Sequence, residues 1–163
     1  MNIWIERTTT GYGMLVRGME SLAPLLLLLF RIYVAVAFWR AGVVKWDDPS
    51  GTHYLFAYEY NVPILSAGVA AFLATWVELI TPWLLGLGIA GRLTAIGLFV
   101  YNIIAVVSYP DLWPNGFWNG LVGNAFSDHQ AWGLMLLAIV IWGPGRWSVD
   151  ALIGRFRRRP ILQ

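Results

Sequence analysis

The stretch "FRIYVAVAFWRAGVVKW", residues 30–46, is apolar enough to enter a membrane, yet it contains Arg31, Arg40 and Lys45. A charged side chain inside a membrane helix is costly unless it is paired or reaches water. Each of the two arginines must therefore have a hydrogen-bonding partner, or lie close enough to the membrane surface for its charged end to reach water. How it does so determines how the other helices pack around it.

The composition indicates an integral membrane protein that lies in a lipid bilayer. Of the 163 residues, 58% are hydrophobic and only 12% are charged, whereas soluble domains carry about 25% charged residues. The chain has no cysteine, which excludes disulfides, thiol redox chemistry and thiolate metal sites. Nucleic-acid binding is excluded as well, because no basic domain surrounds the arginine-rich C-terminal end.

Four apolar segments are long enough to cross a bilayer, which takes about 20 residues each. We expect an all-α bundle of four transmembrane helices. Arg31 interrupts the first apolar run, so we expect an uncleaved span rather than a signal peptide. Lysines and arginines concentrate on one side of the spans, which predicts cytoplasmic N and C termini. The predicted parts are an N-terminal arm (1–21), a membrane domain (22–147, with spans at about 22–44, 63–89, 92–109 and 130–147) and a basic tail (148–163).

Three polar residues have similar predicted depths in their spans. At 1.5 Å per residue, Arg31, Glu78 and Asn102 each lie about 14–15 Å from the cytoplasmic side. An arginine and a glutamate at one depth in an apolar medium should pair. The cluster either orients a polar head group or relays protons, or it only locks the helices together. The sequence leaves both interpretations open.

Arg40 is half a helical turn out of phase with Arg31, so we expect it to point the other way and reach the outer surface. Its expected partners are Glu59, Asp47 or Asp48. It is either an interfacial anchor or part of the rim of a pocket that opens outward. The further residues expected at this outer rim are Lys45, Trp113, His129 and Trp132.

A metal site is not expected. His53 and His129 lie in different outer loops, and no short spacing joins them to each other or to the nearby aspartates. Ordinary loop histidines are the simpler interpretation, and these two are only weak candidates as ligands.

Seven pieces of the chain, in this order and spacing, resemble the DoxX family over about residues 25–155. One is Arg31, and a 14-residue insertion at 115–128 lengthens the second outer loop relative to the family pattern. The other six are "RAGVVK" (40–45), "YEYNVPIL" (58–65), "ATWVELITPWLLGLGIAGRLTA" (74–95), "YPDLWP" (109–114), "HQAW" (129–132) and "GPGRWSVDAL" (143–152).

The resemblance implies a small four-helix protein of the bacterial inner membrane. The family name comes from a subunit of a thiosulfate:quinone oxidoreductase, and other members are linked to oxidative-stress, sulfur or copper-associated operons. Carried over by position, the family's polar pattern comprises Arg31, Arg40, Lys45, Glu78, Arg92, His129 and Asp150.

The leading hypothesis is therefore a membrane subunit of a redox system, without independent catalysis, that binds a quinone or a similar amphipathic molecule. Arg31, Glu78 and Asn102 would contact the head group, and Tyr33 and Tyr101 would add aromatic walls. No covalently bound cofactor is expected, and a protein partner or a homo-oligomer is. The alternatives are a non-catalytic scaffold for another enzyme, which would use the arginine tail and the aromatic outer loop, and a small-molecule transporter.

Overall fold

The computed structural model describes the backbone of residues 3–157 and the side chains of residues 12–156. Residues 158–163 of the predicted basic tail lie outside this range. The described part is helical without strands, which confirms the all-α prediction. Its helices are α1 (Ile3–Asp47), α2 (Pro49–Tyr58), α3 (Ala67–Leu87), α4 (Gly91–Ser108), the short 3-10 helix η1 (Pro110–Leu112), α5 (Phe117–Val122), α6 (Ser127–Trp142) and α7 (Val149–Arg157).

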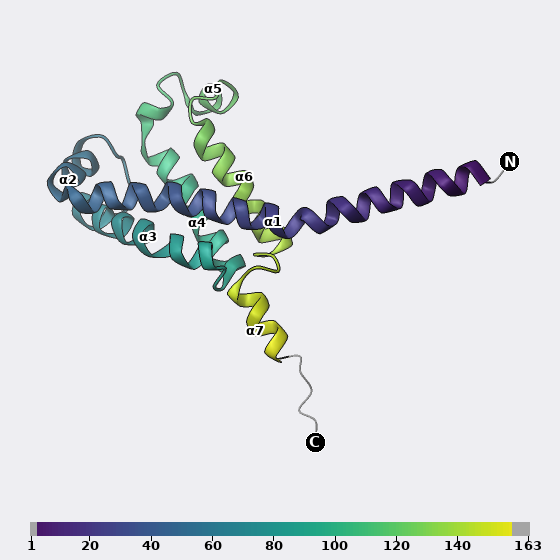
Figure 1. Ribbon diagram of the computed structural model, residues 1–163. Coiled ribbons are helices and arrows are strands. Elements are labelled where there is room, and N and C mark those ends of the chain that lie inside the picture. The colour runs from purple at the N-terminus through teal and green to yellow at the C-terminus, as the bar shows by residue number, and fades with distance from the viewer. Residues whose placement is uncertain (1–2, 158–163) are drawn as a thin grey trace.

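Helices α1, α3, α4 and α6 form a bundle (Figure 1). α1 packs along α3 and also contacts α6, while α4 packs along α6. We call the end of the bundle that carries α2, η1 and α5 the loop end. The opposite end, with the α3–α4 turn and the start of α7, is the turn end. α1 is longer than the bundle, and its N-terminal part projects past the turn end (Figure 1).

Three helices are long and apolar enough to cross a membrane: the part of α1 from Tyr12 to Asp47, α3 and α4. The fourth predicted span folds as α6, which has 16 residues and is therefore about 24 Å long. That is shorter than a hydrocarbon core of about 30 Å. The predicted arm and first span together form the single 45-residue helix α1.

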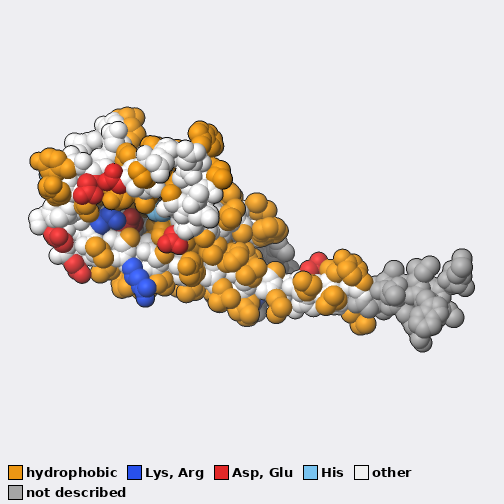
Figure 2. Space-filling model, turned by 90° about the horizontal axis from the view of Figure 1, so that it is seen from above, with side chains coloured by type: hydrophobic (Ala, Val, Ile, Leu, Met, Phe, Trp, Pro, Cys, Tyr) orange, Lys and Arg blue, Asp and Glu red, His pale blue; other side chains and the backbone are white. Residues whose placement is uncertain are grey.

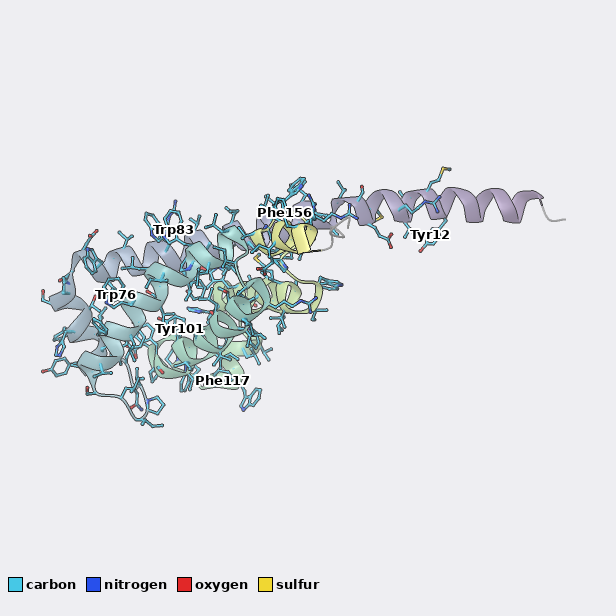
Figure 3. All side chains as sticks on the ribbon, turned by 90° about the horizontal axis from the view of Figure 1, so that it is seen from below. Tyr12, Trp76, Trp83, Tyr101, Phe117 and Phe156 are labelled. Atoms are coloured by element: carbon cyan, nitrogen blue, oxygen red, sulfur yellow. The ribbon has the colours of Figure 1, made fainter. Side chains whose placement is uncertain are left out.

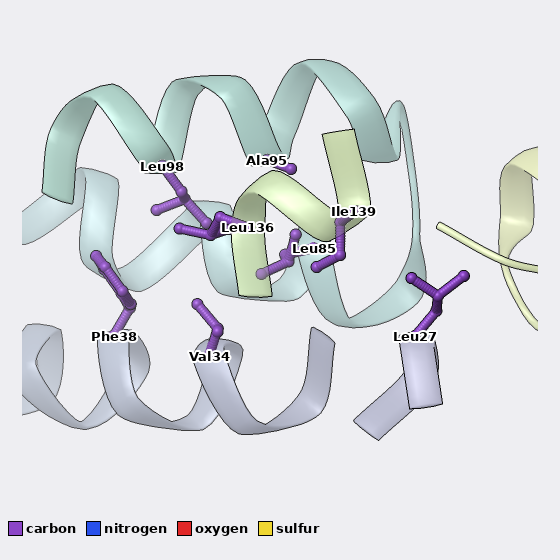
Figure 4. Packing of buried hydrophobic residues seen from close by; sticks show 8 residues of the cluster. All are labelled: Leu27, Val34, Phe38, Leu85, Ala95, Leu98, Leu136 and Ile139. Atoms are coloured by element: carbon purple, nitrogen blue, oxygen red, sulfur yellow. The ribbon is translucent and has the colours of Figure 1, made fainter. Parts of the chain in front are cut away.

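The apolar core fills the middle of the bundle, and each of its four helices contributes to it (Figure 4). Since lipid tails are as apolar as leucine, close packing rather than water exclusion favours such contacts inside a membrane. The aromatic side chains Trp76 and Trp83 lie on the outer surface, whereas Tyr101 lies among the helices (Figure 3). The buried core residues are Leu27, Val34, Phe38, Leu85, Ala95, Leu98, Leu136 and Ile139.

Candidate functional site

The buried carboxylate of Glu78 connects three helices toward the loop end. Its Oε2 atom accepts a hydrogen bond from Lys45 Nζ of α1 at 2.6 Å, and its Oε1 atom accepts one from the Tyr101 hydroxyl of α4 at 2.7 Å. Glu78 is only 6% exposed. A carboxylate in such surroundings needs a countercharge and donors to both oxygens, and the site supplies them.

A glycine lets α1 approach α3 at this point. A Cβ atom on Gly42 would lie 2.8 Å from the Glu78 carbonyl carbon, closer than a side chain can come. Pro82 has no N–H group to donate to the Glu78 carbonyl, one turn earlier in α3. The two backbones therefore meet closely, and Lys45, about one turn beyond Gly42, reaches the carboxylate.

Arg31 does not pair with Glu78, so that prediction is wrong. Arg31 is fully buried at the turn end, where Nη1 donates to the Gly86 carbonyl at 2.8 Å and Nη2 donates to the Trp147 carbonyl. Its Nε atom has no hydrogen-bond partner among the described residues. The guanidinium thus ties the last turn of α3 to the segment before α7.

Asp150 completes this contact at the turn end. Its two carboxylate oxygens accept hydrogen bonds from the backbone N–H groups of Ala90 and Gly91, at 2.8 Å and 2.7 Å. A carboxylate at a helix N-terminus satisfies free N–H groups and complements the helix dipole. Arg31 and Asp150 therefore hold the α3–α4 turn against the start of α7, which indicates a structural role for both.

The depth count failed on α1 alone. Glu78 does lie level with its partner Tyr101, next to Asn102, as counting along α3 and α4 predicts. On α1, however, Gly42 lies beside Glu78, and Arg31 is eleven residues away, or about 16 Å. The count on α1 started at residue 22, the predicted beginning of the first span. Because α1 is one continuous helix that extends past the bundle, residue 22 does not mark the level at which the bundle begins.

A cavity of about 360 Å³ adjoins the Lys45–Glu78–Tyr101 cluster. Its volume lies within the usual range of ligand sites, about 300–1,000 Å³. Figure 2 shows basic, acidic and histidine side chains gathered around a recess in the broad part of the molecule. Most of the wall is apolar, contributed by α1, α2, α3, α4 and α6. Its polar lining residues are Lys45, Tyr60, Glu78, Tyr101, Ser108 and His129.

Ser108 is a polar cavity residue that the sequence analysis missed. Its side chain is 2% exposed, and its Oγ atom has no hydrogen-bond partner among the described residues. A buried hydroxyl without a partner costs free energy. Ala105 follows Tyr101 by four residues and Ser108 follows Ala105 by three, so the helical period could have placed all three on one face.

Tyr60 is a second residue that was missed. Its ring stacks between Phe56 and Tyr109, with centroid distances of 4.6 Å and 4.7 Å. Burial, with Glu78 nearby, raises the pKa of Tyr60 to about 12. Its hydroxyl therefore stays protonated and can donate. Tyr60 lies in an irregular loop, where no periodicity predicts the direction of a side chain.

Asn102 pairs with His129 rather than with Arg31 and Glu78. Its Nδ2 atom donates to the His129 carbonyl at 2.9 Å, and its Oδ1 atom lies 2.8 Å from His129 Nδ1. The His129 ring also contacts Trp132 edge-on, with centroids 4.8 Å apart. His129 and Trp132 both line the cavity, so they are wall residues.

Several predicted residues lie away from this site. Tyr33 is 58% exposed and does not line the cavity. Arg40 is exposed and forms no ion pair with any described residue, so its predicted acidic partners are wrong. Glu59 instead accepts a hydrogen bond from Tyr109, and Asp48 caps α2. Trp113 donates to the Val106 carbonyl.

Within the described residues, no three histidine or acidic side chains come together as metal ligands. His53 is exposed on α2, and His129 is held by Asn102. Neither residue belongs to a set of ligands in the part of the chain that the structure describes.

The long apolar helices and the cavity among them define an α-helical, multi-pass membrane protein with a ligand-sized internal site. Residues 26–110 match the DoxX family model, and the chain belongs to this family. It is also 27% identical over 130 residues to an uncharacterized protein of Haemophilus influenzae, covering 78% of this chain and 82% of that protein. No solved structure matches the chain.

Proposed function

We propose that the protein is a membrane subunit of a redox system and that it binds a quinone or a similarly amphipathic ring compound. The observation that carries this proposal is the cavity of about 360 Å³, whose mainly apolar wall contains the Lys45–Glu78–Tyr101 cluster. Apolar walls with a few placed polar groups are typical of sites for such ligands. The resemblance that suggests a quinone concerns an oxidoreductase subunit within the same family.

The polar groups match the needs of an oxygen-bearing head group. Among the described residues, Lys45 donates one hydrogen bond, to Glu78, and an ammonium carries three N–H donors. The Tyr60 and Ser108 hydroxyls lie in the same wall without a partner of their own among the described residues. A ring with polar oxygens would be held by these donors, and its apolar tail would lie against the aliphatic wall.

In this proposal the protein lies in a bacterial inner membrane with both termini in the cytoplasm, and α6 completes a fourth crossing. The ligand is bound reversibly. The protein has no independent catalysis and passes its ligand to a partner subunit or a second copy. Arg31 has no part in the proposed site, because its hydrogen bonds are made at the turn end.

One observation favours a scaffold as a second function. The projecting part of α1 carries exposed apolar side chains outside the bundle, among them Tyr12, Leu15 and Met19. A docking protein would use this surface and would not need the cavity.

The proposal is tested by filling the cavity. Ala105 lines it on α4, so Ala105→Phe should occupy the space of the ring and weaken binding of a decyl-benzoquinone at least about tenfold, since the ligand would have to displace a packed side chain. Titration calorimetry in nanodiscs, with empty nanodiscs as the blank, measures the affinity. Circular dichroism and the melting temperature establish that the variant folds.

Val100→Phe is the matched control. It adds the same ring to the same helix at a residue that is 49% exposed, and it should leave the affinity unchanged. No binding by the wild-type protein, or equal binding by both variants, would refute the proposed site.

A further inference from the structure

We infer that the cavity discriminates by hydrogen-bond direction: it binds the hydroxyl-bearing, reduced form of a ring compound, a hydroquinone, more tightly than the corresponding quinone. This inference rests on the proposed function and adds the oxidation state of the ligand. The residues that carry it are His129, its partner Asn102, and Ser108.

The Asn102–His129 contacts determine where the imidazole carries its proton. The His129 carbonyl can only accept, so the atom of the Asn102 amide that faces it must be the nitrogen. The amide oxygen therefore faces His129 Nδ1 at 2.8 Å. Because this oxygen can only accept, Nδ1 must carry the N–H group. In the neutral ring, Nε2 is then left with a lone pair.

That lone pair is available to a ligand. Among the described residues, Nε2 has no hydrogen-bond partner. It is also not one of the fully enclosed polar side-chain atoms, so it is accessible. Asn102 borders a second hollow, between α4, α5 and α6, and is not among the residues that line the cavity, whereas His129 borders both spaces. Nε2 points roughly away from Nδ1 in an imidazole ring, and the inference places it toward the cavity, on the side opposite Asn102.

Lys45, Tyr60 and Ser108 can donate from the wall, and both oxygens of the Glu78 carboxylate already accept hydrogen bonds, from Lys45 and Tyr101. His129 Nε2 is therefore the acceptor of the wall without a partner among the described residues, which makes His129 the discriminating residue. A quinone oxygen and a hydroquinone oxygen both accept from Lys45, Tyr60 or Ser108. Only the hydroquinone has an O–H group to donate to His129 Nε2. A quinone carbonyl at that position would place an oxygen lone pair against the Nε2 lone pair, and the two would repel each other.

Ser108 anchors either form. Its hydroxyl is 2% exposed and unpartnered among the described residues, yet it borders the cavity. A hydroxyl can donate to a quinone oxygen, and it can also accept from a hydroquinone. Ser108 therefore adds affinity for the ring compound without selecting its oxidation state.

The test compares decyl-hydroquinone with decyl-benzoquinone, under anaerobic conditions and by calorimetry in nanodiscs. The wild-type protein should bind the hydroquinone about 2- to 10-fold more tightly, the worth of one hydrogen bond. His129→Phe keeps an aromatic ring but removes Nε2, so the hydroquinone should lose its extra affinity and the preference should fall to about 1. Ser108→Ala should weaken both ligands by a similar factor and keep the preference.

A control on the ligand side needs no variant. The dimethyl ether of the hydroquinone keeps the ring and both oxygens but cannot donate, so it should bind no more tightly than the quinone. Equal wild-type affinities for hydroquinone and quinone, or a preference that survives in His129→Phe, would overturn the inference and leave the proposed function standing. Binding of neither compound would overturn both.

Discussion

At the scale of single residues, the two arginines of the first apolar stretch have different roles from those that their spacing suggests. Arg31 is buried and donates to two backbone carbonyls at the turn end, whereas Arg40 is exposed. The countercharge of Glu78 is Lys45. The positively charged residue at the site is thus Lys45, which the sequence analysis expected at the outer rim.

Arg31 should matter for folding and not for ligand affinity. Arg31→Met removes the donor to the partly buried carbonyls of Gly86 and Trp147, and leaving such a group without a partner costs up to about 1–3 kcal/mol. Arg31→Lys keeps the charge and one donor, so its loss should be smaller. Denaturant titration in detergent measures the free energy of unfolding. A stable Arg31→Met protein that has lost only its quinone affinity would contradict this assignment.

At the scale of helices, the close approach of α1 and α3 at Gly42 brings Lys45 to Glu78. A Cβ atom at Gly42 would meet the Glu78 backbone, with 2.8 Å to its carbonyl carbon, and backbone cannot move aside as a flexible side chain can. Gly42→Ala should separate the two helices and destabilise the protein by about 1–3 kcal/mol.

Gly97→Ala on α4 is the control for this helix contact. A Cβ atom there would meet no atom within 4 Å. Its effect should be neutral or stabilising by up to about 1 kcal/mol, because alanine favours the helix. The unfolding free energies of the two variants are compared directly. Equal stabilities would show that the contact at Gly42 does not hold α1 against α3.

Much of the fold could be predicted because apolar length and composition determine which segments become membrane helices. Counting outward from the tight turn between α3 and α4 predicts similar depths for Glu78 and Asn102, and Tyr101, the neighbour of Asn102, does contact Glu78. The Arg31–Glu78 pair could not be predicted correctly, since α1 has no break that marks where it enters the bundle. Backbone carbonyls, which are the true partners of Arg31, leave no sign in a sequence.

Residue type and spacing predicted some of the site. His129 and Trp132 were expected near the outer rim, and both line the cavity. Tyr60 could not be placed, because its direction depends on stacking with Phe56 and Tyr109 in a loop. A serine near the end of an apolar helix carries no signal of its own. The lack of a partner for Ser108 is visible only after packing.

At the scale of the whole molecule, the two ends of the bundle differ: one holds the helices together and the other contains the cavity. The turn end is fastened by Arg31 and Asp150. The cavity lies toward the loop end, where α2 and the α2–α3 loop supply part of its wall. In the proposed function a ring compound would enter the cavity toward the loop end, and the helix contacts at Arg31 would stay unchanged.

The most direct measurement of the central claim is photolabelling with an azido-benzoquinone that carries a decyl tail, followed by peptide mass spectrometry of the protein in nanodiscs. The account predicts labels on the cavity-lining parts of α3 and α4, at residues 70–78 and 101–108, and their loss when excess unlabelled decyl-benzoquinone is added. Labels spread over outward side chains such as Trp83, and unchanged by the competitor, would contradict it.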